Sequence, residues 1–344
     1  MSARLRSLGF ALPRAWAQDE LASGLAQAWE LDGVEKARWD RIVCGSTIRR
    51  RHAVGDLVST LRMSTGERMR VYEREAPELA LRAASEALGK ATIDASAITD
   101  CVVVSCTGFT APGVGNLIAR RLGLRPTVRH TQVGFMGCFG GVLGLRTAVG
   151  TVAAEPGAVV LVVCVELCSL HLRADRSPEN LVASAIFADG AAAAIVDGER
   201  EGGIGRLTLG ATIVLDEAAD AMTWRIGNDG FAMTLTREVP VALERSVRPF
   251  VESLQIPTEE RFAPLAHPGG PGILDAIERG LASVAVVPEA SAASRAVLRD
   301  YGNMSSGSIL FVLDEYLRQG GRPPAQIIAF GPGLTMDGIA LAAP

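Results

Sequence analysis

One cysteine in this sequence has a setting that favours nucleophilic chemistry. Cys138 lies in the string GFMGCFGG, directly before a predicted helix. A helix N-terminus offers unpaired N–H groups and partial positive charge, which lower the pKa of a thiol, and glycines let a substrate approach the backbone. We therefore expect Cys138 to act as a thiolate nucleophile, although a cysteine among glycines is more often only small and buried.

Two further polar residues share this kind of setting. His267 is one of four histidines and precedes the turn sequence PGGPG and a predicted helix. Asn303 lies in YGNMSS, immediately before another helix. An imidazole and an amide can both donate hydrogen bonds to an oxygen that gains negative charge in a reaction. Taken alone, a loop histidine and an asparagine before a helix are more often structural.

The hydrophobic pattern predicts helices and strands that would position these residues. The first half predicts a helix, a strand, two helices and a strand over 78–88, 101–106, 116–122, 139–155 and 158–165. The second half predicts the same order over 241–254, 262–266, 273–285, 308–319 and 326–330. Asn303 lies 165 positions after Cys138, at the corresponding place in this order. We expect an internal duplication, with halves 1–198 and 199–344 separated by the glycine-rich segment 197–205.

Composition narrows the class of protein. Hydrophobic residues make up 48% and charged residues 21%, a balance typical of an α/β globular protein. A net charge of −4 without a long basic run argues against nucleic-acid binding. The longest apolar run, 158–165, is far shorter than the roughly 20 residues of a membrane-spanning helix, so we expect no stable membrane insertion. The six cysteines lack zinc-type spacing, and we expect all of them except Cys138 to be buried thiols in a reducing, cytoplasmic compartment.

The N-terminal segment carries a weak imitation of a secretion signal. Arg4, Arg6 and the triplet AWA at 15–17 have the right residue types, but Pro13 and Arg14 interrupt a short apolar stretch. A first strand followed by a turn is the favoured interpretation.

Four strings resemble type III polyketide synthases in order and approximate spacing over nearly the whole chain: GFMGCFGG, HPGGPGILD, YGNMSSGSILFVLDE and AFGPGLT. The broader resemblance is to condensing enzymes of the thiolase fold. It implies an α/β protein with a five-layered αβαβα fold built from two duplicated halves. The likeness is strongest to bacterial members that act on fatty-acyl or other small acyl starters.

The resemblance implies a mechanism that suits these side chains. Cys138 would take an acyl group from acyl-CoA, and His267 and Asn303 would stabilise the enolate formed when malonyl-CoA loses carbon dioxide. The enolate would extend the acyl chain repeatedly until it cyclises to a pyrone, a resorcinol or a related phenolic product. The implied enzyme is a homodimer whose substrates are acyl-CoA and malonyl-CoA, and it needs no metal, flavin or nicotinamide cofactor.

The resemblance also implies a coenzyme A tunnel. Arg38 and Arg41 match basic positions at its mouth, and the third basic position is Gly45 here, for which one of the three arginines at 49–51 would compensate. Gly269 matches a position along the pantetheine tunnel. For any one arginine, a solvated basic helix end is an equally good interpretation.

Several cavity positions depart from those of plant members. Phe187 matches a gatekeeper aromatic, but Met233 replaces the second gatekeeper, Trp224 replaces a small glycine, and Ala111 replaces a methionine contributed across the dimer. Because of these departures, we expect an aliphatic starter rather than a plant-like aromatic one. Cys106 is either a second reactive thiol or, as is commoner in strands, an inert one. The other implied positions are Thr107, Cys168, Leu170, His171 and Ser305 in the cavity, with Gly331, Pro332 and Gly333 as a scaffold loop.

Three other interpretations remain open. An initiating ketoacyl-acyl-carrier-protein synthase shares the fold and the Cys-His-Asn set, but its histidine motif differs from HPGGPG. A cysteine hydrolase of the papain kind uses the same residue types in different motif contexts and without a duplicated pattern. A nucleotide-binding protein is the weakest of the three, because Gly134, Gly137 and Gly140 lack the spacing of a dinucleotide site.

Overall fold

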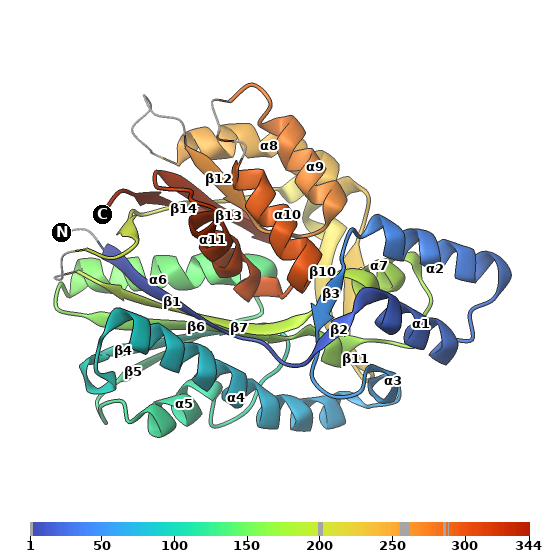
Figure 1. Ribbon diagram of the computed structural model, residues 1–344, viewed down its shortest axis with the longest axis horizontal. Helices are drawn as coiled ribbons and strands as arrows, with labels where there is room; N and C mark the ends of the chain where they lie inside the picture. Colours follow the sequence, from blue (N-terminus) through green and yellow to red (C-terminus); the bar gives the residue numbers. More distant parts are fainter. Residues whose placement is uncertain (1–2, 199–201, 255–261, 285–286, 288) are drawn as a thin grey trace.

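The computed structural model describes residues 3–198, 202–254, 262–284, 287 and 289–344. Ten strands form one mixed sheet in the order β12-β13-β14-β8-β1-β7-β6-β4-β5, with β9 paired to β14. Figure 1 shows these strands crossing the molecule between layers of helices. Their bounds are β1 Ala3–Ala11, β4 Asp100–Ser105, β5 Arg129–Gly134, β6 Val159–Leu167, β7 Asp189–Asp197, β8 Gly205–Leu207, β9 Ala211–Val214, β12 Ala263–Ala266, β13 Ala325–Gly331 and β14 Thr335–Ala342.

The first half supplies an outer helical layer and a buried group of strands. Helices α4 (Thr65–Ala91) and α5 (Val114–Leu122) cover one face, and α6 (Gly140–Ala154) covers the other. All nine residues of β6 are buried, as its sequence VVLVVCVEL suggests for a strand covered on both faces. Helix α4 begins with a capping box between Ser64 and Glu67, which satisfies two of its free N–H groups.

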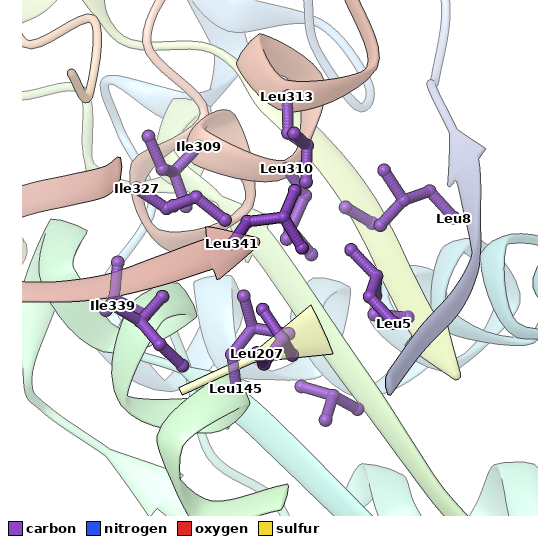
Figure 2. Packing of buried hydrophobic residues seen from close by; sticks show 14 of the residues in the cluster. Leu5, Leu8, Leu145, Leu207, Ile309, Leu310, Leu313, Ile327, Ile339 and Leu341 are labelled. Carbon is purple, nitrogen blue, oxygen red and sulfur yellow. The ribbon is translucent and has the colours of Figure 1, made fainter. Parts of the chain in front are cut away.

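The second half repeats this arrangement. Helices α8 (Glu238–Ser253), α9 (Pro271–Gly280) and α10 (Glu289–Tyr301) lie outside, and α11 (Ser308–Arg318) lies next to α6 between the two groups of strands. Figure 2 shows Leu145 of α6 and Leu310 of α11 in a core completed by strand residues such as Leu5, Ile327 and Leu341. The layers are therefore α, β, α, β and α, and this confirms the expected thiolase-like fold.

A group of smaller elements covers one end of the sheet, on the right in Figure 1. They comprise two short strand pairs and four helices: β2 Ala15–Ala17 with β3 Arg50–His52, β10 Met222–Gly227 with β11 Gly230–Leu235, and α1 Gln18–Ala28, α2 Gly33–Gly45, α3 Leu57–Thr60 and α7 Pro178–Ile186. Short 3-10 helices occupy Ala95–Ala97, Gly137–Phe139, Cys168–His171, Asp216–Ala221 and Ser305–Gly307.

The structure confirms the predicted strands and helices, with differences at their ends. The helix predicted over 78–88 is the C-terminal part of α4, which continues N-terminally through Pro77. The helix predicted over 273–285 ends at Gly280, and residue 285 lies outside the described residues. Strand β7 ends at Asp197 and β8 begins at Gly205, but the division into 1–198 and 199–344 stays a prediction.

One described stretch, Gly137–Ala154, has the length and apolar composition that a membrane crossing requires, and 56% of it is buried inside the protein. It includes α6, which packs in the central layer.

Candidate active site

The turn that carries Cys138 is fixed by a loop from the other half of the chain. Gly137 has a φ of 69°, and a Cβ added there would lie 2.3 Å from Cδ of Pro332. A Cβ on Gly331 would lie 3.2 Å from the backbone nitrogen of Cys138. Only glycine fits such contacts, so the loop at 331–333 and the Cys138 turn pack directly on each other.

Cys138 itself is a buried thiol. Its Sγ donates a hydrogen bond to Oγ of Ser305 at 3.6 Å, and the side chain of Asn303 also hydrogen-bonds to the sulfur. Burial raises the pKa of Cys138 to about 12, although these two hydrogen bonds lower it. This shift is opposite in sign to the one expected from a helix N-terminus, because the loss of water destabilises the thiolate more than the local dipoles stabilise it.

Backbone bonds fix Asn303 beside the predicted gatekeeper. Its N–H donates to the carbonyl of Ile186 at 2.9 Å, and its own carbonyl accepts from the N–H of Ala188 at 2.8 Å. Phe187 lies between these two partners. The Asn303 Oδ1 accepts from the N–H of Ser305 at 2.9 Å, which leaves the amide NH2 group as the donor.

His267 is fully buried at the end of β12. Its backbone N–H donates to the carbonyl of Ile328 at 2.8 Å, and its ring lies edge-on to Phe330 with centroids 5.5 Å apart. Among the described residues neither ring nitrogen has a hydrogen-bond partner. Burial lowers the pKa of His267 to about 3, so the ring is neutral and keeps one N–H donor. Strand β13 continues from Phe330 to Gly331, which contacts Cys138.

Glu166 is a site residue that the sequence reasoning missed. It lies in β6, is fully buried, and accepts hydrogen bonds from Thr107 Oγ1 at 2.7 Å, from the N–H of Cys106 at 3.1 Å and from Ser306 Oγ. Burial raises the pKa of Glu166. Its signal in the sequence was an acidic residue directly after the apolar run at 158–165, within what is a buried strand.

A cavity opens beside Cys138. Its lining contains ten of the predicted residues, namely Cys106, Thr107, Cys138, Cys168, His171, Phe187, Trp224, Met233, Ser305 and Pro332. Residues that the sequence did not indicate include Leu21, His52, Leu57, Met222 and Phe231. Leu170 is not among the residues that line this cavity and packs instead in the core with residues of α4. Across the described ranges, no cluster of His, Cys, Asp and Glu side chains could hold a metal ion.

Aromatic contacts close one wall of the cavity. The Trp224 indole N–H donates to the carbonyl of Cys106 at 2.9 Å, and its ring packs edge-on against His171 and Phe231. His171 has both ring nitrogens engaged, since Nε2 donates to the carbonyl of Thr107 at 2.6 Å and Nδ1 accepts from the N–H of Phe231 at 3.1 Å. This histidine therefore supports the wall and has no free nitrogen for chemistry.

Three of the predicted coenzyme A residues, Arg38, Arg41 and Gly269, do not line this cavity, whereas Arg51 does. Arg38 and Arg41 are exposed on α2, and a Cβ on the half-buried Gly269 would lie 3.0 Å from Phe330. Arg51 is only 3% exposed, and its guanidinium donates to the carbonyls of Ser184 and Phe187 at 2.8 and 2.7 Å. A side chain held in this way cannot bind a coenzyme A phosphate in solvent, so Arg51 is excluded as the compensating arginine.

Comparisons with known proteins agree with this geometry. The family models for the N-terminal and C-terminal domains of chalcone and stilbene synthases match residues 2–200 and 206–343. The C-terminal type III polyketide synthase domain of Steely1, a type I/III hybrid from Dictyostelium, is 28% identical, with a TM-score of 0.92 over 100% of this chain and 99% of that one. PKS-I from the brown alga Ectocarpus siliculosus is also 28% identical, with a TM-score of 0.89 over 100% of this chain and 98% of that one. The chain therefore belongs to the chalcone and stilbene synthase family and is a type III polyketide synthase, a decarboxylating condensing acyltransferase.

Proposed function

We propose that this enzyme loads an acyl group from acyl-CoA onto Cys138 and extends it with malonyl-CoA. Two observations carry the proposal. The Asn303 side chain hydrogen-bonds to the buried Cys138 thiol, and the ring of His267, which has no partner among the described residues, packs on Phe330, next to the Gly331 that contacts the Cys138 turn. In loading, Sγ bonds to the acyl carbon, the bond to the coenzyme A sulfur breaks, and the thiol proton goes to the departing thiolate.

Extension needs donors for a developing negative charge. When malonyl-CoA loses carbon dioxide, the electrons of the broken bond form an enolate whose charge rests on the thioester oxygen. A neutral His267 and the Asn303 amide each offer an N–H group in a site that excludes water. Preorganised donors of this kind contribute about 3 to 4 kcal/mol each to the stability of such an oxyanion. The enolate carbon then attacks the acyl group on Cys138.

The cavity supports a proposal about the substrate and product. Trp224 is held across the cavity by its bond to Cys106, and this wall limits the space for an acyl chain. We expect a small aliphatic starter and cyclisation to a pyrone, a resorcinol or a related phenolic compound. Arg38 and Arg41 are proposed to attract the phosphates of coenzyme A at the surface, with Gly269 along the tunnel.

Exposed apolar side chains support a homodimer. Phe109, Phe135 and Met136 are 54%, 48% and 39% exposed, and the last two directly follow β5, the edge strand of the sheet. Large apolar side chains beside an open strand edge are typical of an interface between subunits. We propose that a second copy of the chain covers this edge. A cytoplasmic location stays a prediction, consistent with six free cysteines.

The function is tested by incubating the enzyme with a panel of acyl-CoA starters and malonyl-CoA, without carrier protein. We expect products with several added two-carbon units by mass spectrometry, and none from the Cys138→Ala variant. A single extension that depends strictly on an acyl carrier protein would support an initiating ketoacyl synthase instead. Peptide hydrolysis without condensation would contradict both.

A further inference from the structure

Arg51 is a buried cation on the wall of the cavity that contains Cys138. It lies in β3, is 3% exposed, and is the only arginine or lysine among the described residues that line this cavity. Burial lowers the pKa of Arg51 to about 10 and the charge of Asp189 acts against this shift, so the guanidinium is positively charged at neutral pH. A buried charge costs much free energy unless it is paired and hydrogen-bonded.

The guanidinium of Arg51 has more donors than described acceptors. Nε donates to Oε1 of Gln18 at 2.7 Å. Nη1 donates to the carbonyls of Ser184 and Phe187 at 2.8 and 2.7 Å, and both of these residues also line the cavity. Nη2 is buried and has no hydrogen-bond partner among the described residues. Its N–H groups are therefore available to a ligand that enters the cavity.

The carboxylate that acts on Arg51 is engaged by other groups. Asp189 accepts hydrogen bonds from the N–H of Val54 at 2.8 Å and from the N–H and the hydroxyl of Ser169 at 2.7 and 2.5 Å. Neither of its oxygens accepts from Nη2 of Arg51. Asp189 therefore lowers the cost of the buried charge through space and leaves the Nη2 donors unused.

Arg51 lies next to the chain segment that carries Asn303. A Cβ added to Gly302 would lie 3.0 Å from Cγ of Arg51. The Asn303 N–H donates to the carbonyl of Ile186 at 2.9 Å, and Nη1 of Arg51 donates to the carbonyl of the next residue, Phe187. The free donors of Arg51 are therefore close to a proposed donor for the enolate oxygen.

We propose that Nη2 of Arg51 binds the carboxylate of the malonyl group and so makes the cavity select malonyl-CoA as the extender. This role rests on the proposed function, in which malonyl-CoA is the reactant with a negative charge on its acyl part. The coenzyme A part is the same in starter and extender and cannot distinguish them. A charge-assisted hydrogen bond to a carboxylate is about twice as strong as a neutral one.

The contact acts before carbon dioxide leaves. The bond between the carboxylate carbon and the methylene carbon breaks, its electron pair forms the enolate, and carbon dioxide departs as a neutral molecule. Negative charge thus moves from the carboxylate beside Arg51 to the thioester oxygen that Asn303 and His267 bind. Because the contact is strongest before this bond breaks, it strengthens the binding of malonyl-CoA and does not accelerate its decarboxylation.

Two stable analogues that differ by one charge test this role. In the amide analogues of malonyl-CoA and acetoacetyl-CoA, an N–H group replaces the thioester sulfur, so both resist acyl transfer to Cys138 and decarboxylation. Their acyl parts have nearly the same size, but only the malonyl group is charged. Isothermal titration calorimetry gives a Kd for each analogue. The ratio of the two Kd values cancels any loss that affects both, such as a displaced Phe187.

The variants are Arg51→Gln, Arg51→Lys and Arg68→Gln. Arg68 is a matched control because it is also fully buried and has an Nη2 without a described partner, but it does not line the cavity. Wild type should bind the malonyl analogue about tenfold or more tightly than the neutral one, and this result needs no variant.

We expect Arg51→Gln to weaken binding of the malonyl analogue by about 10- to 100-fold relative to the neutral analogue. Arg51→Lys keeps the charge and should recover part of the preference, and Arg68→Gln should leave it at the wild-type value. In steady-state kinetics, Arg51→Gln should raise the KM for malonyl-CoA with little change in kcat or in the KM for a neutral starter.

Three results would overturn the role of Arg51. They are equal affinity of wild type for the two analogues, an equal loss for both analogues in Arg51→Gln, and the same change of preference in Arg68→Gln. The second of these would show that Arg51 only supports the chain around Phe187. All three concern binding alone, so the proposed function fails separately, if wild type forms no extended product from acyl-CoA and malonyl-CoA.

Discussion

Glu166 and His267 are two buried titratable groups that we assign to the site, and their hydrogen-bond partners differ. Glu166, from the first half, accepts hydrogen bonds from two hydroxyl groups and a backbone N–H group at close range. The ring of His267, from the second half, has no described partner at either nitrogen. The hydrogen bonds of Glu166 are therefore complete without substrate, and those of the His267 ring are left open for it.

The lack of a described partner for the buried His267 ring costs free energy, and a bound ligand that accepts a hydrogen bond would recover it. A buried polar group without a hydrogen bond costs about 1 to 3 kcal/mol. Such a cost at His267 is explained if the missing partner is the thioester oxygen of the substrate. The hydrogen bonds around Glu166, by contrast, hold β4, β6 and the start of α11 in fixed relation.

The largest expected effect concerns the open side of the site. His267→Ala and Asn303→Ala should each slow malonyl-CoA decarboxylation by about 10²- to 10³-fold, because each removes one donor to the enolate oxygen. Acyl loading on Cys138 should persist, and His267→Gln, which keeps an N–H group, should retain more activity than His267→Ala. Release of carbon dioxide and the mass of the acyl-enzyme measure the two steps. If loading were lost while decarboxylation persisted, the roles assigned to the two halves would be wrong.

The second prediction concerns acid stability. The pKa of His267 is about 3 in the folded chain against 6.5 ordinarily, so below pH 6.5 the unfolded chain binds a proton that the folded chain does not. The free energy of unfolding should therefore fall as the pH falls, by about 2 to 3 kcal/mol between pH 6.5 and 4.5 from this residue. Urea unfolding of wild type and His267→Gln at both pH values measures it. Equal losses in the two proteins would contradict the shift.

The third prediction concerns the wall that joins the halves. Trp224→Gly should raise kcat/KM for acyl-CoA starters several carbons longer by about tenfold or more, since it removes the side chain that blocks the cavity. Product masses from a panel of starters provide the measurement. Trp224→Phe, which keeps an aromatic wall but loses the bond to Cys106, is the matched control. An unchanged preference in Trp224→Gly would place the acyl chain elsewhere.

The smallest expected effect lies at the surface. The double change Arg38→Ala and Arg41→Ala should raise the KM for malonyl-CoA by about three- to tenfold with little change in kcat, because exposed charges contribute about 1 kcal/mol or less each. Arg120→Ala, an exposed arginine on α5, serves as control. Steady-state kinetics at low and high salt measure the effect, and an unaltered KM would remove both arginines from the coenzyme A site.

The sequence predicted the order of elements, because apolar periodicity is a local pattern. The roles of Cys138, His267 and Asn303 came from the resemblance to type III polyketide synthases and stay predictions. Apolar periodicity located β4, β6, β12 and β13. The protonation state of Cys138 was not predictable in this way, because burial by the second half outweighs the local helix terminus. Arg51 resembled its exposed neighbours in sequence, and only tertiary packing buries it against Phe187.

Strand β8 carries a consequence for how the enzyme holds together. Leu207 pairs with Ala3 on one side and Leu341 on the other, so three residues of β8 join β1 to β14 by backbone hydrogen bonds. A polypeptide cut to residues 1–198 would present β1 as a bare edge, and one cut to residues 199–344 would present β8 as a bare edge, and such an edge invites aggregation. Attempts to exchange halves between related synthases should therefore keep this strand matched to both of its neighbours.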